Sequence, residues 1–172
     1  MIAANNSSFA HDFPTRQKVG GTHLNFFLFE QLPLPAPMAF ATTAHWDQDV
    51  STGDWISPRV RELVSISARM SRVVFSDGIF VPNSGRREGL RAELDAAFFH
   101  LYGLDRDDVD YVMDTFPIVR RKDEERHGEY RTKRLILEIY DEMATAIDTG
   151  QPYQTRLDPP PADPSLRIQA RP

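Results

Sequence analysis

The residue types best suited to chemistry in this sequence are the basic side chains of residues 120–134. This short stretch contains seven cations: Arg120, Arg121, Lys122, Arg126, Arg131, Lys133 and Arg134. Guanidinium and ammonium groups bind phosphate oxygens, and the free N–H groups at the start of a helix add to that attraction. The stretch is therefore a candidate for contact with the phosphate backbone of DNA.

The same cations have an internal alternative. Arg131, Lys133 and Arg134 stand at the start of a predicted helix, an order that opposes the helix dipole and costs about 0.3 to 1 kcal/mol for each well-placed charge. Phosphate would offset this cost, and so would the acidic segment that precedes it, which holds Asp105, Asp107, Asp108, Asp110 and Asp114. Two interpretations stay open: a surface that faces DNA, and a helical hairpin closed by internal ion pairs.

A second candidate surface surrounds the diglycine near the start of the chain. Arg16 and Lys18 precede the two glycines, and Thr22, His23 and Asn25 follow them. Two cations and three short polar side chains are suited to gripping phosphate and contacting base edges. The alternative is a short helix capped by Thr22, with its charges in solvent.

The sequence predicts no catalytic or metal-binding set. No Gly-x-Gly turn that would cradle S-adenosylmethionine occurs, and residues 158–161, Asp-Pro-Pro-Pro, lack the final aromatic with which adenine methylases stack on a flipped base. The five histidines form no His-x-x-x-His pair, and cysteine is absent. We therefore expect no methyl transfer, no metal and no cofactor in the chain itself.

Composition sets the outer limits. The 172 residues, of which 41% are hydrophobic, suffice for one domain with a core. A net charge of −5 excludes a protein that coats nucleic acid through bulk charge, so DNA contact requires local patches. The longest apolar runs are far shorter than a membrane span, and we expect a cytoplasmic protein with no membrane contact.

Apolar periodicity predicts a mainly α protein with about four main helices, minor strand content and irregular N- and C-terminal segments. The helices are expected at 58–75, 88–102, 106–116 and 129–148, where apolar side chains recur at helical spacing. The side chains expected to be buried are Leu63, Leu94, Phe98, Val112, Met113, Ile136, Ile139, Tyr140 and Met143.

Three parts of the chain differ in composition. Residues 1–37 are loop-like, with one short helical stripe, and end in a proline-rich connector, residues 38–150 form the helical domain, and residues 151–172 form a proline-rich tail. Within the domain, residues 38–57 hold both tryptophans among turn formers and are expected to form an ordered loop on the core, with a short strand at Ile79. The tail is expected to be extended or disordered unless it docks.

Four blocks of sequence carry a family resemblance: 16–27 with 30–33, then 86–87 with 90–95 and 100–104, then 116–143, and finally 153–161. The third block is the strongest, with Phe-Pro-Ile-Val-Arg-Arg-Lys-Asp-Glu-Glu-Arg-His-Gly-Glu-Tyr leading into an apolar-striped helix. In this order the blocks resemble the C-terminal, target-recognition-associated region of Eco57I-like adenine-specific DNA methyltransferases of type II restriction-modification systems, which fuse methylase and target recognition in one polypeptide.

The resemblance implies a non-catalytic C-terminal fragment that recognises DNA or scaffolds the enzyme, truncated from or encoded apart from its methylase core. S-adenosylmethionine would belong to that core, and the partners would be double-stranded DNA and the core or another restriction-modification subunit. The candidate DNA contacts are Arg16, Lys18, His23, Asn25, Arg120, Arg121, Lys122, Arg131, Lys133 and Arg134. Two alternatives are a protein-interaction module that docks a separate methylase or helicase subunit, and an inactive gene remnant.

Overall fold

The computed structural model describes residues 1–21, 23–73 and 78–168. These contain ten α-helices: α1 (Ile2–Asn5), α2 (Phe9–Lys18), α3 (Phe26–Phe29), α4 (Pro37–Ala41), α5 (Thr52–Val64), α6 (Ala68–Val73), α7 (Ser84–Leu101), α8 (Arg106–Asp114), α9 (Pro117–His127) and α10 (Arg131–Thr149). The strands are β1 (Thr43–Ala44), β2 (Asp47–Ser51), β3 (Ile79–Phe80) and β4 (Arg167–Ile168), and a 3-10 turn covers Pro164–Leu166. β1 pairs antiparallel with β2, and β3 pairs antiparallel with β4.

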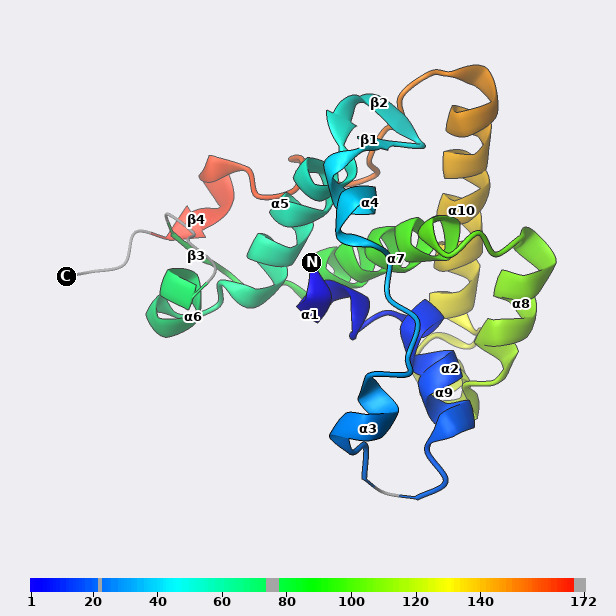
Figure 1. The fold of residues 1–172 in the computed structure, drawn as a ribbon. Helices are drawn as coiled ribbons and strands as arrows, with labels where there is room; N and C mark the ends of the chain where they lie inside the picture. Colours follow the sequence, from blue (N-terminus) through cyan, green and yellow to red (C-terminus); the bar gives the residue numbers. More distant parts are fainter. Residues whose placement is uncertain (22, 74–77, 169–172) are drawn as a thin grey trace.

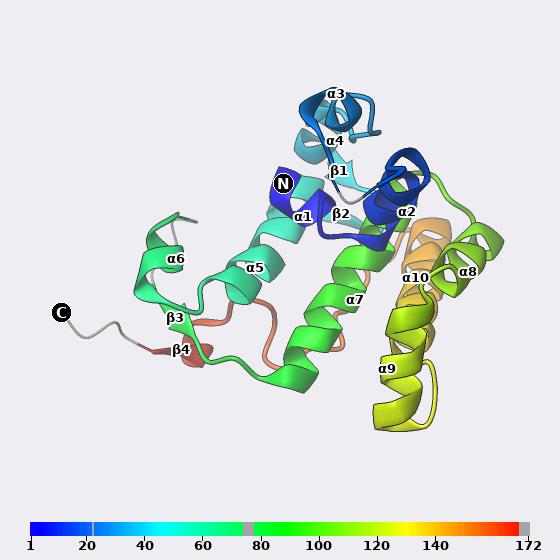
Figure 2. The same ribbon diagram turned by 90° about the horizontal axis from the view of Figure 1, so that it is seen from below.

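The core is built around α7, which lies at the centre of the molecule and is crossed by α10 (Figure 1). Phe98 and Phe99 of α7 meet Ile136, Ile139 and Met143 of α10, and all five side chains are buried. Seen from below, α5 lies on one side of α7, and α9 and α10 lie on the other (Figure 2). The first half of α7, the helix α9 and the start of α10 therefore border one surface.

The mainly helical class is confirmed, but the expectation of about four main helices is wrong. The N-terminal segment, predicted to be largely irregular, forms α1 and α2, because Ser8 caps α2 by accepting the His11 N–H through its side chain. Local capping of this kind starts a helix without a long apolar stripe. Among the described residues, no helix combines the length and apolar content needed to cross a bilayer.

Three predicted helices are confirmed to within a few residues of their ends. The ranges 88–102, 106–116 and 129–148 correspond to α7, α8 and α10. Asn83 caps α7 earlier than expected, and Asp105 caps α8 in a capping box with Asp108. Eight of the nine predicted core side chains are buried, and the exception is half-buried: Leu63.

The predicted helix 58–75 is wrong in its start and in its buried face. α5 begins at Thr52 and carries Pro58 inside it, and it ends at Val64 before the separate α6. The buried face of α5 holds Arg59 and Glu62 in addition to Trp55. The prediction from apolar residues alone therefore assigned the wrong residues to the buried face. Residues 74–75 of the predicted range lie outside the described residues.

The expected loop at 38–57 is instead regular structure. It forms α4, the β1–β2 hairpin and the first turn of α5, which Ser51 caps by accepting the Asp54 N–H. The expectation that it packs on the core is confirmed, because Trp46 and Trp55 are buried with their rings edge to face at 5.2 Å. Strands β1 and β2 are only a few residues long, so apolar periodicity could not reveal them.

The cation-rich hinge before α10 is also helical, forming α9. Pro117 stands at its first position, and Gly128 ends it at a φ of 75°. Pairs one turn apart support it, since Arg120 Nε donates to Glu124 Oε1 at 2.8 Å. The helix has no buried residue, which explains why apolar spacing did not predict it.

The proline-rich tail is docked on the helices through residue 168. Tyr153 is buried, and its hydroxyl donates to Glu93 Oε1 at 3.1 Å. Thr155 donates its hydroxyl to the same oxygen, and Arg59 Nε donates to Glu93 Oε2 at 2.7 Å. A buried carboxylate with three donors holds the tail and satisfies its own charge.

A second carboxylate anchors the end of the tail. Glu62 Oε2 accepts the backbone N–H of Ala162 at 2.8 Å and a guanidinium N–H of Arg86 at 3.0 Å. Arg86 also donates to the carbonyl of Pro160 at 3.1 Å. These bonds bring the tail beside β3, with which β4 pairs. Docking thus depends on acids in α5 and α7 that are distant in sequence from the tail.

Candidate functional site

A groove of about 600 Å³ runs along one face of α7. Its sides are α5 and the α1–α2 segment on one side and α9 with the start of α10 on the other, as the positions of these helices in Figure 2 indicate. We call it the cationic groove, because five cations line it: Arg87, Arg91, Lys122, Arg126 and Arg131.

The deeper part of the cationic groove is apolar. Val60, Leu63 and Leu135 are half-buried and line it from α5 and α10. Val119 of α9 is also half-buried, and its neighbour Ile118 is 58% exposed. Aliphatic side chains that line a concavity without being fully covered favour an apolar occupant, at roughly 25 cal/mol per Å² removed from water.

The exposed part of the lining is cationic. Arg91 of α7 and Lys122 and Arg126 of α9 are exposed, and none forms an ion pair within the described residues. Arg87, one turn before Arg91, is half-buried and donates to the Leu63 carbonyl at 2.8 Å. In a chain of net charge −5, three unpaired cations at one concavity mark a local positive potential.

The acids of the groove already have partners. Glu88 Oε2 lies 3.5 Å from Arg131 Nε, an ion pair that joins α7 to α10. Asp123 Oδ2 accepts the Thr132 backbone N–H at 2.6 Å and so caps the start of α10. The cap occupies the helix N–H group that a phosphate would otherwise use.

The third acid, Asp95, is buried at the edge of the groove. Its Oδ1 accepts the Phe9 backbone N–H at 2.9 Å, which fastens the start of α2 to α7. Burial raises the pKa of Asp95 to about 7, against the lowering effects of the Phe9 hydrogen bond and the charge of Arg91. Near neutral pH this carboxyl therefore contributes only part of a negative charge to the groove.

The cations of the candidate surface around the diglycine have internal partners. Arg16 Nη2 pairs with Asp12 Oδ2 at 2.8 Å, and its guanidinium lies 4.4 Å from the centroid of the Phe116 ring. Lys18 Nζ donates to the Gln31 carbonyl at 3.0 Å, and Asn25 caps α3 by accepting the Leu28 N–H.

Two further residues belong to this predicted surface. His23 is exposed. Thr22, the predicted helix cap, lies outside the described residues. The α2 cations and Asn25 thus have structural partners, and none of this set lines the cationic groove.

Among the hinge cations, the structure brings Lys122, Arg126 and Arg131 to the groove, and the others pair with acids. Arg120 pairs with Glu124, and Arg121 Nε lies 3.8 Å from Glu125 Oε1. Arg134 pairs with Glu129 at 2.9 Å and with Glu138 at 2.7 Å. These pairs are exposed and of low energy individually, but they leave little positive charge free for phosphate.

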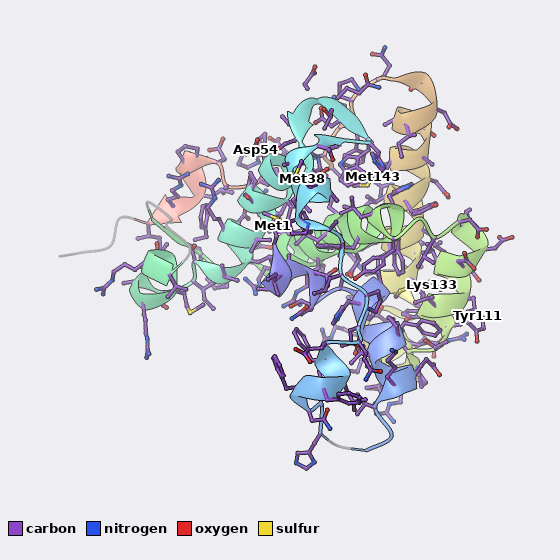
Figure 3. The ribbon with its side chains drawn as sticks, in the orientation of Figure 1. Met1, Met38, Asp54, Tyr111, Lys133 and Met143 are labelled. Carbon is purple, nitrogen blue, oxygen red and sulfur yellow. The ribbon has the colours of Figure 1, made fainter. Side chains whose placement is uncertain are left out.

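Lys133 adopts the internal alternative. Its Nζ lies 2.9 Å from Asp110 Oδ1 and 2.8 Å from Asp114 Oδ1, and it lies beside α8 in Figure 3, where Tyr111 projects outward. Burial acts to lower the pKa of Lys133, but the hydrogen bonds to Asp114 and Asp110 outweigh it and raise the pKa above its usual value. The acidic α8 thus neutralises one of the cations that oppose the α10 dipole.

Sequence reasoning did not select Arg87, Arg91 or Arg126 as binding residues. The available signal is their spacing: Arg87 and Arg91 are one helical turn apart, and so are Lys122 and Arg126. Two such pairs on two helices define two cationic edges. That the edges face one groove depends on how α7 and α9 pack, which spacing does not reveal.

The described residues contain no group of three or more His, Asp or Glu side chains placed to hold a metal ion. The Asp-Pro-Pro-Pro run of 158–161 lies in the docked tail, where its Pro160 carbonyl accepts a hydrogen bond from Arg86. The lining of the groove supports binding through apolar contact and charge.

Comparison with known proteins adds no relative. No family model matches the sequence, no curated protein matches it, and no solved structure matches it. Two features of this chain therefore bear on its function: the geometry of the groove and the resemblance carried by the sequence blocks.

Proposed function

We propose that this chain is a non-catalytic scaffolding module of an adenine DNA methyltransferase of the restriction-modification type. Its task is to dock the methylase core, or another subunit of the same system, through the cationic groove. The observation that carries the proposal is the groove itself, where half-buried aliphatic side chains lie together with three cations that form no ion pair within the described residues.

The sequence blocks that resemble the methyltransferase family support the choice of partner. The blocks at 86–87 and 90–95 contribute Arg87 and Arg91 to the groove, and the block at 116–143 contributes Lys122 and Arg126 of α9. Residues that the resemblance singles out from separate parts of the chain thus meet at one surface. A shared surface is what a docking role for these blocks requires.

The test is reconstitution with a purified adenine methylase core of the restriction-modification type. We expect the two purified proteins to form a complex of defined mass by light scattering, and the complex to methylate DNA faster than the core alone. Replacement of Lys122 and Arg126 by Glu should abolish the complex, whereas Arg121→Glu, on the same helix but outside the groove, should not. A core that ignores the chain, or that binds both variants equally well, would contradict the proposal.

Direct contact with double-stranded DNA is the second candidate, favoured by the exposed and unpaired cations of α9. If phosphates rather than a protein meet Lys122 and Arg126, duplex binding should fall steeply with salt, and the double Glu variant should reduce the salt slope by about two units. Binding that is salt-insensitive, or unchanged in the variant, would remove this candidate.

A further inference from the structure

We infer that the cationic groove receives an acidic amphipathic helix of a partner protein. The inference rests on the docking function proposed above and specifies the chemistry of what docks. Three properties of the groove carry it: its apolar depth, its unpaired cations and the absence of a strand edge along it.

The apolar depth requires an occupant with an apolar face. Leu63, Leu135 and Val119 approach the groove from three different helices and are each only half covered. Ile118 extends this surface toward solvent. An occupant that removes these side chains from water gains hydrophobic free energy, which a purely ionic ligand does not supply.

The cations require that the remaining faces of the occupant be acidic. Arg91 stands on α7, and Lys122 and Arg126 stand on α9, so positive charge borders the apolar depth from two helices. Glu88 and Asp123 are already engaged by Arg131 and by a backbone N–H group. Lys122 and Arg126 form no ion pair within the described residues, so carboxylates of a docked segment would meet these two cations without a competing acid. This complementarity selects an acidic segment over a basic one.

The backbone around the groove selects a helix over an extended segment. The lining residues belong to α1, α2, α5, α7, α9 and α10 or to the turns next to them, and no strand is among them. An extended peptide would leave its N–H and C=O groups facing helices whose own backbone bonds are internal. A helix satisfies its backbone itself and presents one apolar stripe, which is the helix-in-groove mode of recognition.

Nucleic acid fits the groove less well. A duplex presents phosphates on a stiff cylinder, which would meet the exposed cations and leave the aliphatic depth uncovered. Single strands bind through bases stacked on aromatic faces. Phe9 is the one Phe, Tyr or Trp side chain among the described lining residues, and its ring already packs against Phe116 with centroids 4.7 Å apart.

The experiment uses the full chain and a designed probe. The probe is a fluorescein-labelled peptide of about four helical turns, with leucines at i, i+3, i+4 and i+7 and glutamates on the other faces. Three comparison ligands accompany it: a scrambled peptide of the same composition, a polyglutamate peptide of the same length, and a labelled DNA duplex. Fluorescence anisotropy gives a Kd for each.

The variants test the groove. Lys122→Glu/Arg126→Glu should weaken binding of the amphipathic probe by at least about tenfold. Ile118→Glu should do the same through the apolar contact. Arg121→Glu should leave the Kd within about twofold of the parent chain, because Arg121 lies outside the groove. Thermal melting of each variant separates lost binding from lost folding, and the two groove variants change exposed side chains that the fold does not need.

The result expected is saturable binding of the amphipathic probe, with the scrambled and polyglutamate peptides at least about tenfold weaker. Equal binding of all three peptides would show charge attraction alone and overturn the inference, and so would tight binding of the duplex with none of the probe. Should the probe fail while the methylase core still forms its groove-dependent complex, the inference fails and the proposed docking function stands.

Discussion

Lys133 of α10 and Asp110 of α8 form an ion pair, with Nζ 2.9 Å from Oδ1. Asp114, one turn along α8, binds the same ammonium group. Lys133 thus joins the acidic helix α8 to the start of α10, where the cations oppose the dipole of α10. The charge order of the sequence left two partners open for these cations, phosphate or internal acids. Lys133 pairs with acids of a neighbouring helix, so it is not available to phosphate.

The first prediction concerns the ion pairs of Lys133. Lys133→Gln should destabilise the fold by about 1 kcal/mol, because two partly exposed carboxylates lose their shared cation and repel each other. The loss should shrink in high salt, which screens both the lost attraction and the new repulsion. Urea unfolding at low and high salt measures it, with Arg121→Gln as the control for an exposed cation. An unfolding midpoint equal to that of the parent chain at low salt would show that these ion pairs contribute nothing.

Asp95 should make stability depend on pH. Its pKa in the folded chain is raised to about 7 from an ordinary 3.8, so the folded state holds the proton more tightly than the unfolded state. Its stabilising contribution is therefore complete below the ordinary pKa and is lost as pH rises from about 4 through about 7.

Replacement of Asp95 by Asn keeps an acceptor for the Phe9 N–H and removes the ionisation. The variant should be more stable than the parent chain by about 2 to 4 kcal/mol near pH 7, and similar to it near pH 4. Urea unfolding across this pH range is the measurement, and Asp49→Asn, at an exposed position, is the control. If the unfolding free energies of the parent chain and the Asp95→Asn variant changed in parallel with pH, the raised pKa of Asp95 would be refuted.

Phe98 and Ile139 should be the costliest core positions to truncate. Phe98 is fully buried in α7, and Ile139 is 2% exposed in α10. Phe98→Ala or Ile139→Ala should each destabilise the fold by roughly 2 to 5 kcal/mol through cavity formation. Ile118→Ala, which truncates an exposed side chain of the groove, should cost far less. Equal unfolding midpoints for the three variants would show that the core is misplaced.

The carboxylate of Glu93 should hold the tail. Glu93→Gln leaves the buried guanidinium of Arg59 without its counter-charge, which should destabilise the fold by about 3 to 5 kcal/mol. The tail should then open, so trypsin should cut after Arg156 faster than in the parent chain. Glu125→Gln, an exposed acid, should change neither quantity.

A rescue variant separates charge from packing at Glu93. Changing Arg59 and Glu93 together to Met removes both charges and should recover part of the lost stability. Unchanged tryptic cutting after Arg156 in Glu93→Gln would show that the tail is held by other contacts.

Helices α7 and α10 were predictable because each carries apolar side chains at helical spacing, although α7 also buries Glu93 and Asp95. Phe98 and Leu94 of α7, and Ile136, Ile139 and Met143 of α10, each recur at helical spacing and all are buried. In α5 the same reasoning failed, because the buried face carries charged residues that are satisfied by partners far along the chain. Periodicity cannot reveal such pairs.

The groove was predictable only in part. Lys122 and Arg131 were chosen for their charge, and both line it. The other four candidate contacts of the hinge were assigned to DNA by type, although acids engage them: Arg120, Arg121, Lys133 and Arg134. Helix α9 was missed since it buries no residue, and its signals were a proline at the start and a glycine at the end. Which cations stay free depends on tertiary distances to acids, and these follow from packing rather than from composition.

The most direct test of the docking role is amide hydrogen exchange of the full chain, followed by mass spectrometry, with and without the methylase core. If the cationic groove docks the core, the core should slow exchange at the end of α5, the first half of α7, α9 and the start of α10, which surround the groove. Protection confined to α3 and α4, where Phe26 and Met38 are exposed, would place the interface elsewhere and contradict the account. So would exchange that the core leaves unchanged throughout the chain.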